Sequence, residues 1–311
     1  MSSTLHPSPE ATPALACAAQ SDAAQIECHA LSCDTRWGLL SARVCGRLTR
    51  DSHQSDPNDG ARPLALLLHG GHGSWQHWQS NLPLLSEYLD LVVPDLPGFG
   101  QSCDLPQDST LNDMAVGLHD ALRARFGRAP DLIVGFSFGA LLAAVMADMT
   151  QAARPAVVLI NPPLGQDVSP EVIDMLEQAA AKVRRGGLAA GIEHSLRNIM
   201  LSDQRLVTPE LLEQASTQAR QARFASRRLS RVTDFRPLMV PLAGRCDLLL
   251  GGRDPHHRAS LAERLPQYQR ILGADRVHVL SQAAHWLQRD CPDDFDHIVR
   301  AVAAGLRQNK S

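Results

Sequence analysis

The 311-residue chain has the composition of an ordinary globular protein and no strong charge bias. Its formal net charge is −3, with 20% charged and 44% hydrophobic residues. Binding to nucleic acid or to an anionic membrane surface usually needs a basic excess, which is absent here. No apolar run approaches the roughly 20 residues that a membrane-spanning helix requires. We therefore expect a small-molecule substrate, and neither a nucleic-acid nor a membrane partner.

Residues 1–25 are predicted to form a disordered tail. No Lys or Arg precedes Arg36, and the apolar run is short, whereas a secretory signal needs a basic start and a longer apolar core. The seven cysteines are scattered, odd in number and without a CxxC pair. This pattern argues against a disulfide framework or a zinc knuckle and predicts a protein of the reducing cytoplasm.

Short apolar runs alternate with helix-length segments over most of the remaining chain. Two entry strands are expected within residues 26–48, and a polar loop follows at 49–63. The later runs are nearly continuous in Val, Leu and Ile, which is typical of strands covered on both faces. They are residues 63–69, 89–95, 131–136, 156–162, 246–252 and 276–281. The expected helices lie near 74–87, 111–127, 138–152, 258–268 and 292–308.

This alternation predicts an α/β fold with a mostly parallel central sheet and helices on both faces. Residues 165–235 interrupt the alternation with helical segments that begin at Ser169-Pro170 and Thr208-Pro209, without an intervening strand. We therefore expect a core formed by residues 26–164 and 236–311, with residues 165–235 inserted as a helical lid.

The segment Gly135-Phe136-Ser137-Phe138-Gly139 lies between a predicted strand and a predicted helix. This G-x-S-x-G pattern is typical of a nucleophile elbow, where small flanking residues allow a strained turn. The serine oxygen would then project beside a helix N-terminus, where backbone N–H groups favour developing negative charge. We interpret Ser137 as a catalytic nucleophile.

A serine nucleophile needs a base and an orienting carboxylate, which we assign to His285 and Asp254. His285 follows the last predicted strand, and Asp254 follows the strand before it. Both loops would open on the same edge of the sheet as Ser137, in the order Ser, Asp, His. Weaker rivals, interpreted as solvated loop residues, are Asp247, Asp275, His256 and His257.

The oxyanion hole of such a site needs two backbone N–H donors, predicted at Phe138 and Gly71. Gly71 belongs to the glycine-rich loop 69–74, where glycines allow close approach of the backbone to a substrate oxygen. His69 and His72 in this loop lack a carboxylate or cysteine at ligand spacing, so we expect no metal. No organic cofactor is required either.

The motifs HGGHGSWQHW, VVPDLPGFGQS, GFSFGA, GGRD and AAHW occur in this order. With them, the chain resembles the α/β-hydrolase family from about residue 36 to 308. The resemblance implies a Ser-His-Asp hydrolase with a helical lid.

Residues 195–215 and the HWLQ segment show a narrower resemblance, to carbon–carbon hydrolases that split the dienoates formed by ring cleavage. Those enzymes carry Asn before the nucleophile, where this chain has Phe136, and a lid Arg at the position of Ala215. Arg220 or Arg223 could replace that arginine. Phe136 would add apolar wall, which favours an ester with an apolar or aromatic acyl group.

The predicted lid is also basic, with ten Lys or Arg against five Asp or Glu between residues 180 and 235. This excess either attracts anionic substrates or forms a solvated helix face. The predicted activity is serine ester hydrolysis through an acyl-enzyme. Its alternatives are carbon–carbon bond hydrolysis, acyl transfer or perhydrolysis by the same triad, and a non-catalytic ligand-binding role. A homodimer is one alternative for the oligomeric state.

Overall fold

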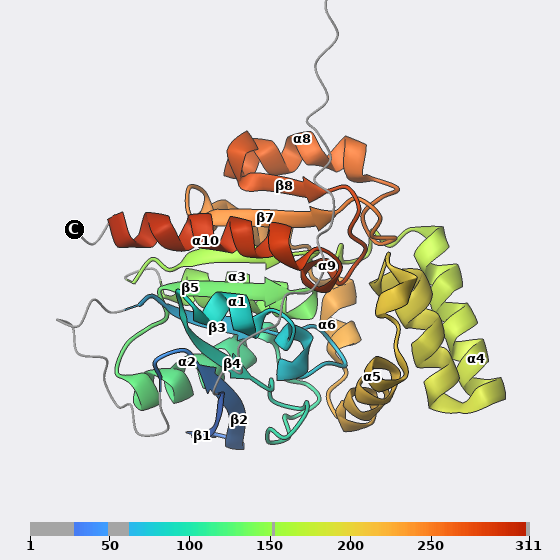
Figure 1. The fold of residues 1–311 in the computed structure, drawn as a ribbon, viewed down its shortest axis with the longest axis horizontal. Helices are drawn as coiled ribbons and strands as arrows, with labels where there is room; N and C mark the ends of the chain where they lie inside the picture. Colours follow the sequence, from blue (N-terminus) through green and yellow to red (C-terminus); the bar gives the residue numbers. More distant parts are fainter. Residues whose placement is uncertain (1–27, 49–61, 151–152, 309–311) are drawn as a thin grey trace, which may run out of the picture.

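The computed structural model of the chain describes residues 28–48, 62–150 and 153–308, so the predicted tail at 1–25 lies outside them. Eight strands form one sheet with helices on both sides (Figure 1), as the alternation of apolar runs predicted. The strands are β1 (His29–Thr35), β2 (Gly38–Cys45), β3 (Leu64–Leu68), β4 (Asp90–Pro94), β5 (Leu132–Phe136), β6 (Ala156–Ile160), β7 (Cys246–Gly251) and β8 (Val277–Leu280).

The strand order across the sheet is β1-β2-β4-β3-β5-β6-β7-β8. Strands β3 to β8 pair in parallel, whereas β2 is antiparallel to both β1 and β4. The parallel strands therefore all end at one edge of the sheet. Loops that are far apart in the chain meet at that edge.

The parallel strands are buried on both faces because the sheet separates two apolar cores. Alternate side chains of β3 enter different cores: Leu66 packs with one and Leu67 with the other. Helices α2 (Leu111–Phe126), α3 (Phe138–Met149) and α8 (Leu261–Leu272) cover the first core. Helices α1 (Leu82–Ser86), α9 (Leu287–Asp290) and α10 (Pro292–Gln308) cover the second. Both faces are thus covered by helices.

A long helical insertion follows β6 and lies beside the carboxyl ends of the strands (Figure 1). Its first two long helices begin where their capping signals predicted. The Ser169 and Thr208 hydroxyls accept hydrogen bonds from the backbone N–H groups of Val172 and Leu211, and a proline follows each cap. The insertion comprises α4 (Pro170–Ser195), a π-helical turn (Leu196–Met200), α5 (Pro209–Gln221) and α6 (Ser226–Val232).

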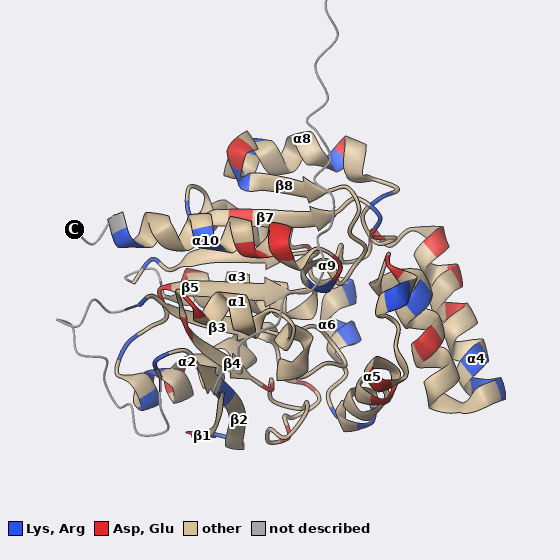
Figure 2. Ribbon diagram, viewed as in Figure 1, with Lys and Arg blue, Asp and Glu red and all other residues tan. Residues whose placement is uncertain are grey.

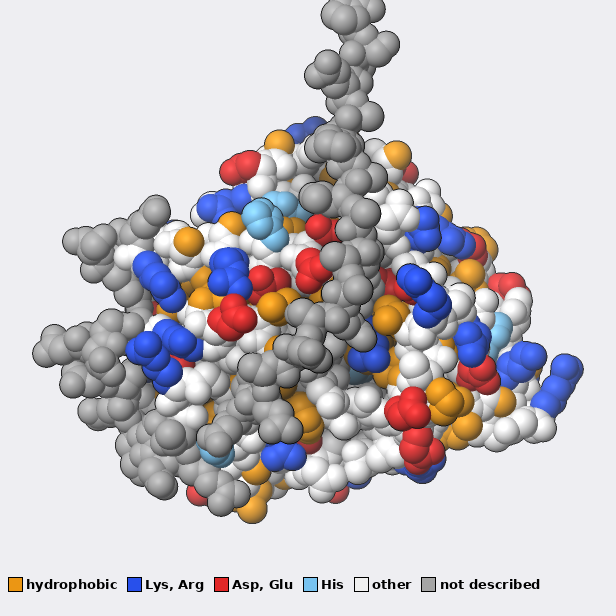
Figure 3. Space-filling model, viewed as in Figure 1, with side chains coloured by type: hydrophobic (Ala, Val, Ile, Leu, Met, Phe, Trp, Pro, Cys, Tyr) orange, Lys and Arg blue, Asp and Glu red, His pale blue; other side chains and the backbone are white. Residues whose placement is uncertain are grey.

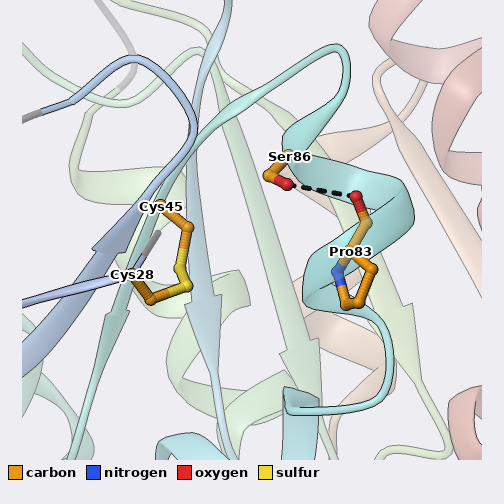
Figure 4. Close-up of a disulfide and its surroundings, with 4 residues drawn as sticks. All are labelled: Cys28, Cys45, Pro83 and Ser86. Atoms are coloured by element: carbon orange, nitrogen blue, oxygen red, sulfur yellow. Dashed lines mark hydrogen bonds between the residues drawn. A yellow bond between two sulfur atoms is a disulfide. The ribbon is translucent and has the colours of Figure 1, made fainter. Parts of the chain in front are cut away.

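A disulfide joins Cys28 and Cys45, so the prediction of unpaired cysteines is wrong for this pair (Figure 4). The antiparallel register of β1 and β2 pairs His29 with Val44, which places Cys28 opposite Cys45 at a Cα–Cα distance of 4.5 Å. This register is not visible in the cysteine spacing. The cysteine argument for a reducing cytoplasm therefore loses its support. Cys33, Cys103 and Cys246 carry free thiols.

Two observations bear on membrane spanning and on the charge of one face of the molecule. Within the described ranges, no helix combines the length and the apolar character needed to cross a bilayer. On the face seen in Figure 3, acidic and basic side chains are interspersed. This face therefore lacks the continuous basic patch of a nucleic-acid-binding surface.

The sheet and α3 are packed so closely at Gly139 that we expect Gly139→Ala to destabilise the protein. A Cβ there would lie 2.3 Å from the Leu68 carbonyl oxygen, a rigid backbone atom. We expect the free energy of unfolding to fall by about 3 kcal/mol, the scale of overpacking in a core.

The matched control is Gly305→Ala in α10, where a Cβ would meet no atom within 4 Å. Because alanine favours a helix over glycine, this control should gain about 0.5–1 kcal/mol. Urea denaturation measures both changes. Equal stability of the two variants would contradict the packing seen at Gly139.

Candidate active site

Ser137 occupies a strained turn between β5 and α3. Its φ of 52° and ψ of −117° are unusual for a residue with a side chain, and it directly precedes the first residue of α3. The Ser137 N–H donates to the Ile160 carbonyl at 2.9 Å, which ties the turn to β6. The structure thus has the strained strand-to-helix turn that the G-x-S-x-G pattern predicted at this position.

The two glycines that flank Ser137 allow the turn to pack. A Cβ on Gly135 would lie 2.3 Å from the Gly139 carbonyl oxygen. Gly70, in the neighbouring loop, also approaches the turn, since a Cβ there would lie 3.3 Å from the Ser137 Cβ. Glycines on both sides thus let three backbone segments meet around one serine.

The three residues predicted as a triad lie in one hydrogen-bonded chain. His285 Nε2 is 3.0 Å from Ser137 Oγ, and His285 Nδ1 is 2.7 Å from Asp254 Oδ2. Asp254 follows β7, and His285 follows β8, so both loops start at the edge where Ser137 lies. The tautomer that donates from Nδ1 to Asp254 leaves Nε2 free to accept the serine proton.

Asp254 is fully buried and remains ionised because of His285. Burial alone would raise its pKa, but the attraction between the carboxylate and the imidazolium form of His285, together with the hydrogen bond from His285, outweighs burial, so the pKa is lowered. The second carboxylate oxygen, Oδ1, accepts the backbone N–H of His256 at 2.9 Å. Both oxygens are therefore held, and the carboxylate fixes the imidazole orientation.

Gly71 and Phe138, the predicted oxyanion donors, lie beside Ser137 on the wall of the same cavity. They are also adjacent to each other, because a Cβ on Gly71 would be 4.0 Å from the Phe138 Cβ. Among the described residues, no acceptor binds the backbone N–H of either one. Two free donors next to a nucleophile are what a developing oxyanion requires.

Two buried side chains hold the glycine-rich loop in place. His69 accepts the Leu96 N–H through Nε2 at 2.9 Å, and its Nδ1 lies 2.7 Å from the Gly70 carbonyl. Asp95 Oδ1 accepts the Trp75 N–H at 2.8 Å. Burial lowers the pKa of His69, so the ring is neutral and suits this pair of contacts. His69 therefore has a structural role in this loop.

Sequence reasoning missed two residues that hold the His285 loop. Asn161 is fully buried with a φ of 42°, and its side-chain amide donates to the Ala284 and His285 carbonyls while its oxygen accepts the Gly251 N–H. The Asp290 carboxylate accepts the backbone N–H groups of Ala284 and Ser202. The signal available was weak, since Asn161 stands as a lone polar residue at the end of an apolar run.

A cavity of about 790 Å³ opens above Ser137 and His285. The strand-end loops form its floor, and the helical insertion forms its walls. This volume is typical of a small-molecule site. Its apolar wall includes Leu164, Val168, Ile173, Leu176, Ile199 and Met200.

The weaker rivals for the triad lie elsewhere or have other contacts. Asp247 pairs with Arg276 and His278, away from Ser137. His257 is buried, with Nε2 3.0 Å from the Pro162 carbonyl, and the His256 ring lies 4.8 Å from the His285 ring. Neither histidine is the solvated loop residue that the sequence suggested, because the loop after β7 folds under the cavity.

Three predictions about side chains around the cavity also need correction. Phe136 does not line the cavity but packs behind it, against His77 and His285. Arg220 pairs with Glu213, and Arg223 pairs with Asp104. Neither arginine lines the cavity, so neither occupies the place of the lid arginine in the carbon–carbon hydrolases.

The described residues contain one cluster whose donor atoms could hold a metal ion. Asp254, His256 and His285 offer ligand atoms within 4.8 Å of one another. Two of these residues already bind each other in the chain that ends at Ser137, and a metal ion would compete with that contact.

The chain is similar to known proteins in family profile, in sequence and in fold. Residues 65–297, about three quarters of the chain, match the profile described as the alpha/beta hydrolase family. A curated relative, the dihydrolipoyllysine-residue acetyltransferase component of the acetoin cleaving system from Cupriavidus necator, is 25% identical over 79% of this chain. The match spans just under two thirds, 65%, of that longer protein.

Two solved structures share the fold at low sequence identity. Carboxylesterase CesB from Bacillus subtilis has a TM-score of 0.66 at 19% identity, covering 90% of this chain and 93% of its own. The 2-hydroxy-6-oxo-6-phenylhexa-2,4-dienoate hydrolase from Rhodococcus has a TM-score of 0.65 at 19% identity, covering 89% and 99%. At this identity they establish the architecture alone.

The buried His257 should make the protein less stable as the pH falls. Burial lowers its pKa to about 4, so between pH 6.5 and 4 the unfolded chain binds a proton that the folded chain excludes. In His257→Gln, the loss of unfolding free energy per pH unit should be smaller by up to about 1.4 kcal/mol.

Urea denaturation at several pH values measures this slope. His297→Gln, the same change at an exposed position of α10, is the control and should keep the slope of the unmodified protein. If the unfolding free energy of His257→Gln and of the unmodified protein fell equally with pH, the assignment of this pH dependence to His257 would be contradicted.

Proposed function

Since the chain belongs to the alpha/beta hydrolase family, we propose that it hydrolyses a carboxylic ester through Ser137, His285 and Asp254. The observation that carries this proposal is the pair of contacts from the His285 ring, 3.0 Å to Ser137 Oγ and 2.7 Å to Asp254 Oδ2. This arrangement activates a hydroxyl for attack on a carbonyl carbon.

In the first half-reaction, Ser137 Oγ attacks the ester carbonyl while its proton moves to His285 Nε2. Asp254 stabilises the positive charge that the imidazole acquires. The carbonyl oxygen becomes an oxyanion, which the Gly71 and Phe138 N–H groups stabilise. Collapse of this intermediate breaks the bond to the alcohol, which takes the proton from His285 and leaves an acyl-enzyme.

In the second half-reaction, water replaces the alcohol as the attacking group. His285 takes a proton from the water, the oxygen bonds to the acyl carbon, and the same two N–H groups stabilise the second oxyanion. Collapse of this intermediate breaks the bond between the acyl carbon and Ser137 Oγ, which takes the proton back from His285, and the carboxylic acid is released. The chain therefore needs no redox step and no cofactor for this reaction.

The cavity wall supports an ester with an apolar or aromatic acyl group. Leu164, Ile173 and Leu176 would contact such a group, and all three precede or belong to the insertion helix α4. We propose that the helical insertion acts as a lid over Ser137, because its residues complete the cavity that the sheet edge leaves open.

Carbon–carbon hydrolysis of a dienoate is the second candidate function. It is favoured by the structural likeness to the Rhodococcus dienoate hydrolase. It is disfavoured by Phe136, which stands where those enzymes carry Asn, and by Ala215 at the lid position. The same triad serves both reactions, so the substrate decides between them.

Ser137→Ala should abolish ester hydrolysis because it removes the attacking oxygen. We expect kcat/KM for 4-nitrophenyl butyrate to fall by about 10⁴-fold or more. A fluorophosphonate probe should label the unmodified protein and not the variant. Retained turnover in Ser137→Ala would contradict the assignment.

Asp254→Asn should impair the same reaction, since the amide no longer stabilises the charged imidazole. A loss of about 10⁴-fold in kcat is expected by analogy with other serine triads. The control is Asp247→Asn, whose carboxylate contacts Arg276 and His278 and not the triad. Near-normal activity of Asp254→Asn would place the acid elsewhere.

A substrate panel separates the two candidate functions. It compares aliphatic and aromatic 4-nitrophenyl esters with 2-hydroxy-6-oxo-6-phenylhexa-2,4-dienoate under the same conditions. The proposal predicts that kcat/KM is higher for at least one of the esters than for the dienoate. Faster cleavage of the dienoate would replace ester hydrolysis with the second candidate.

A further inference from the structure

Two arginines of α6 face the cavity that contains Ser137. Arg227 and Arg231 both line it, and their spacing of four residues places them on the same side of the helix. The helix sequence, SRRLSRV, contains three arginines and no acidic residue, which Figure 2 shows as blue without red on α6.

Among the described residues, these two arginines have no protein partner, whereas five other arginines of the insertion do. Arg184 and Arg185 of α4 are also without a partner, but they are exposed and lie outside the cavity. Arg223 binds Asp104, Arg220 binds Glu213, and Arg228 donates to the Ser109 carbonyl. Arg197 and Arg205 are likewise paired, with Glu193 and Asp203. Within the described part of the chain, Arg227 and Arg231 make neither an ion pair nor a hydrogen bond. Ion pairs therefore compensate part of the positive charge of the insertion outside the cavity, whereas the two arginines on the cavity wall have no ion pair among the described residues.

The Arg227 side chain lies at the cavity wall, where it stays exposed and has Arg231 as a neighbouring cation. Partial removal from water lowers the pKa of its guanidinium, and Arg231 lowers it further. Arg227 lies near enough to His72 to help burial lower the pKa of that ring to about 4. One carboxylate, Glu177, also lines the cavity, so two cations face one anion there. An anionic ligand would compensate the excess positive charge.

We infer that Arg227, supported by Arg231, binds an anionic group of the substrate, and that the substrate is an ester that also carries a carboxylate. This inference rests on the proposed ester hydrolysis. A guanidinium presents a planar pair of N–H donors that matches a carboxylate. The apolar wall around Ile173 and Leu176 would hold the chain between the ester and the carboxylate.

This site differs from the lid arginine expected from the carbon–carbon hydrolases. That position falls at Ala215 in α5, whereas Arg227 belongs to the next helix, α6. The first residue of α6, Ser226, also approaches the oxyanion loop, since a Cβ on Gly71 would lie 2.7 Å from Ser226 Oγ. Helix α6 therefore connects the anion site directly to the predicted oxyanion donor.

The test compares two esters that differ only in a terminal carboxylate, 4-nitrophenyl hexanoate and mono-4-nitrophenyl adipate. The unmodified protein should have the higher kcat/KM for the adipate ester. Arg227→Gln should lower the ratio of the adipate to the hexanoate kcat/KM by at least about tenfold, through the loss of a charge-assisted hydrogen-bond pair. The preference should also shrink at high salt.

The matched control is Arg185→Gln, the same substitution at an exposed arginine of α4 that does not line the cavity. It changes the net charge of the protein by the same amount and should leave kcat/KM for both esters unchanged. The comparison therefore separates local binding of the carboxylate from general electrostatic attraction. An Arg227→Gln variant with an unchanged ratio would overturn the inference.

Binding measured without turnover keeps this inference distinct from the proposed reaction. Calorimetric titration with hexanoate uses Ser137→Ala, with and without Arg227→Gln. Binding weakened at least about tenfold by Arg227→Gln supports the anion site even if neither ester is hydrolysed. A lack of ester hydrolysis would contradict the proposed function and leave the anion site supported. Equal binding by both variants, or no binding, overturns the anion site.

Discussion

The backbone turn at Ser137 is the constraint on which the rest of the site depends. A serine at φ 52° persists only because the surrounding structure holds it, and here β3, β6 and α3 all contact the turn. The turn raises one hydroxyl above the edge where the parallel strands end. Every other candidate residue reaches it from a loop that begins at that edge, so the sheet topology sets the chemistry that is available.

Backbone hydrogen bonds couple the helical insertion to the base. The His285 and Trp286 N–H groups donate to the Ile199 and Met200 carbonyls, which belong to the π-helical turn of the insertion. Asp290 joins the same two segments from the other side through Ser202 and Ala284. The loop that carries His285 is thus held partly by the insertion. Changes in the insertion are therefore expected to alter the position of the imidazole as well as the shape of the cavity.

The sequence was sufficient to predict those elements whose signals lie in a short local pattern. Continuous apolar runs located the strands, and the glycines around Ser137 located the turn, because each signal lies within a few residues. It failed where the deciding contact joins distant segments. The Cys28–Cys45 pair depends on strand register, and the role of Asn161 depends on a loop more than 120 residues away. Arg223 lies in the loop between α5 and α6, whereas Arg227 lies in α6 and lines the cavity, a difference that composition does not reveal.

The electrostatics of the cavity link the anion site to the proposed chemistry. Burial lowers the pKa of His256 and His72 to about 4, so at neutral pH these rings add hydrogen-bonding groups but no charge. The fixed positive charge of the cavity therefore comes from Arg227 and Arg231. During proton transfer His285 becomes cationic in the same cavity, and the like charges of the two arginines oppose that step. A substrate carboxylate bound at Arg227 would cancel part of this repulsion, so the correct substrate would itself favour protonation of the base. An ester without the carboxylate would leave the repulsion in place, and the preference would appear in the chemical step as well as in binding.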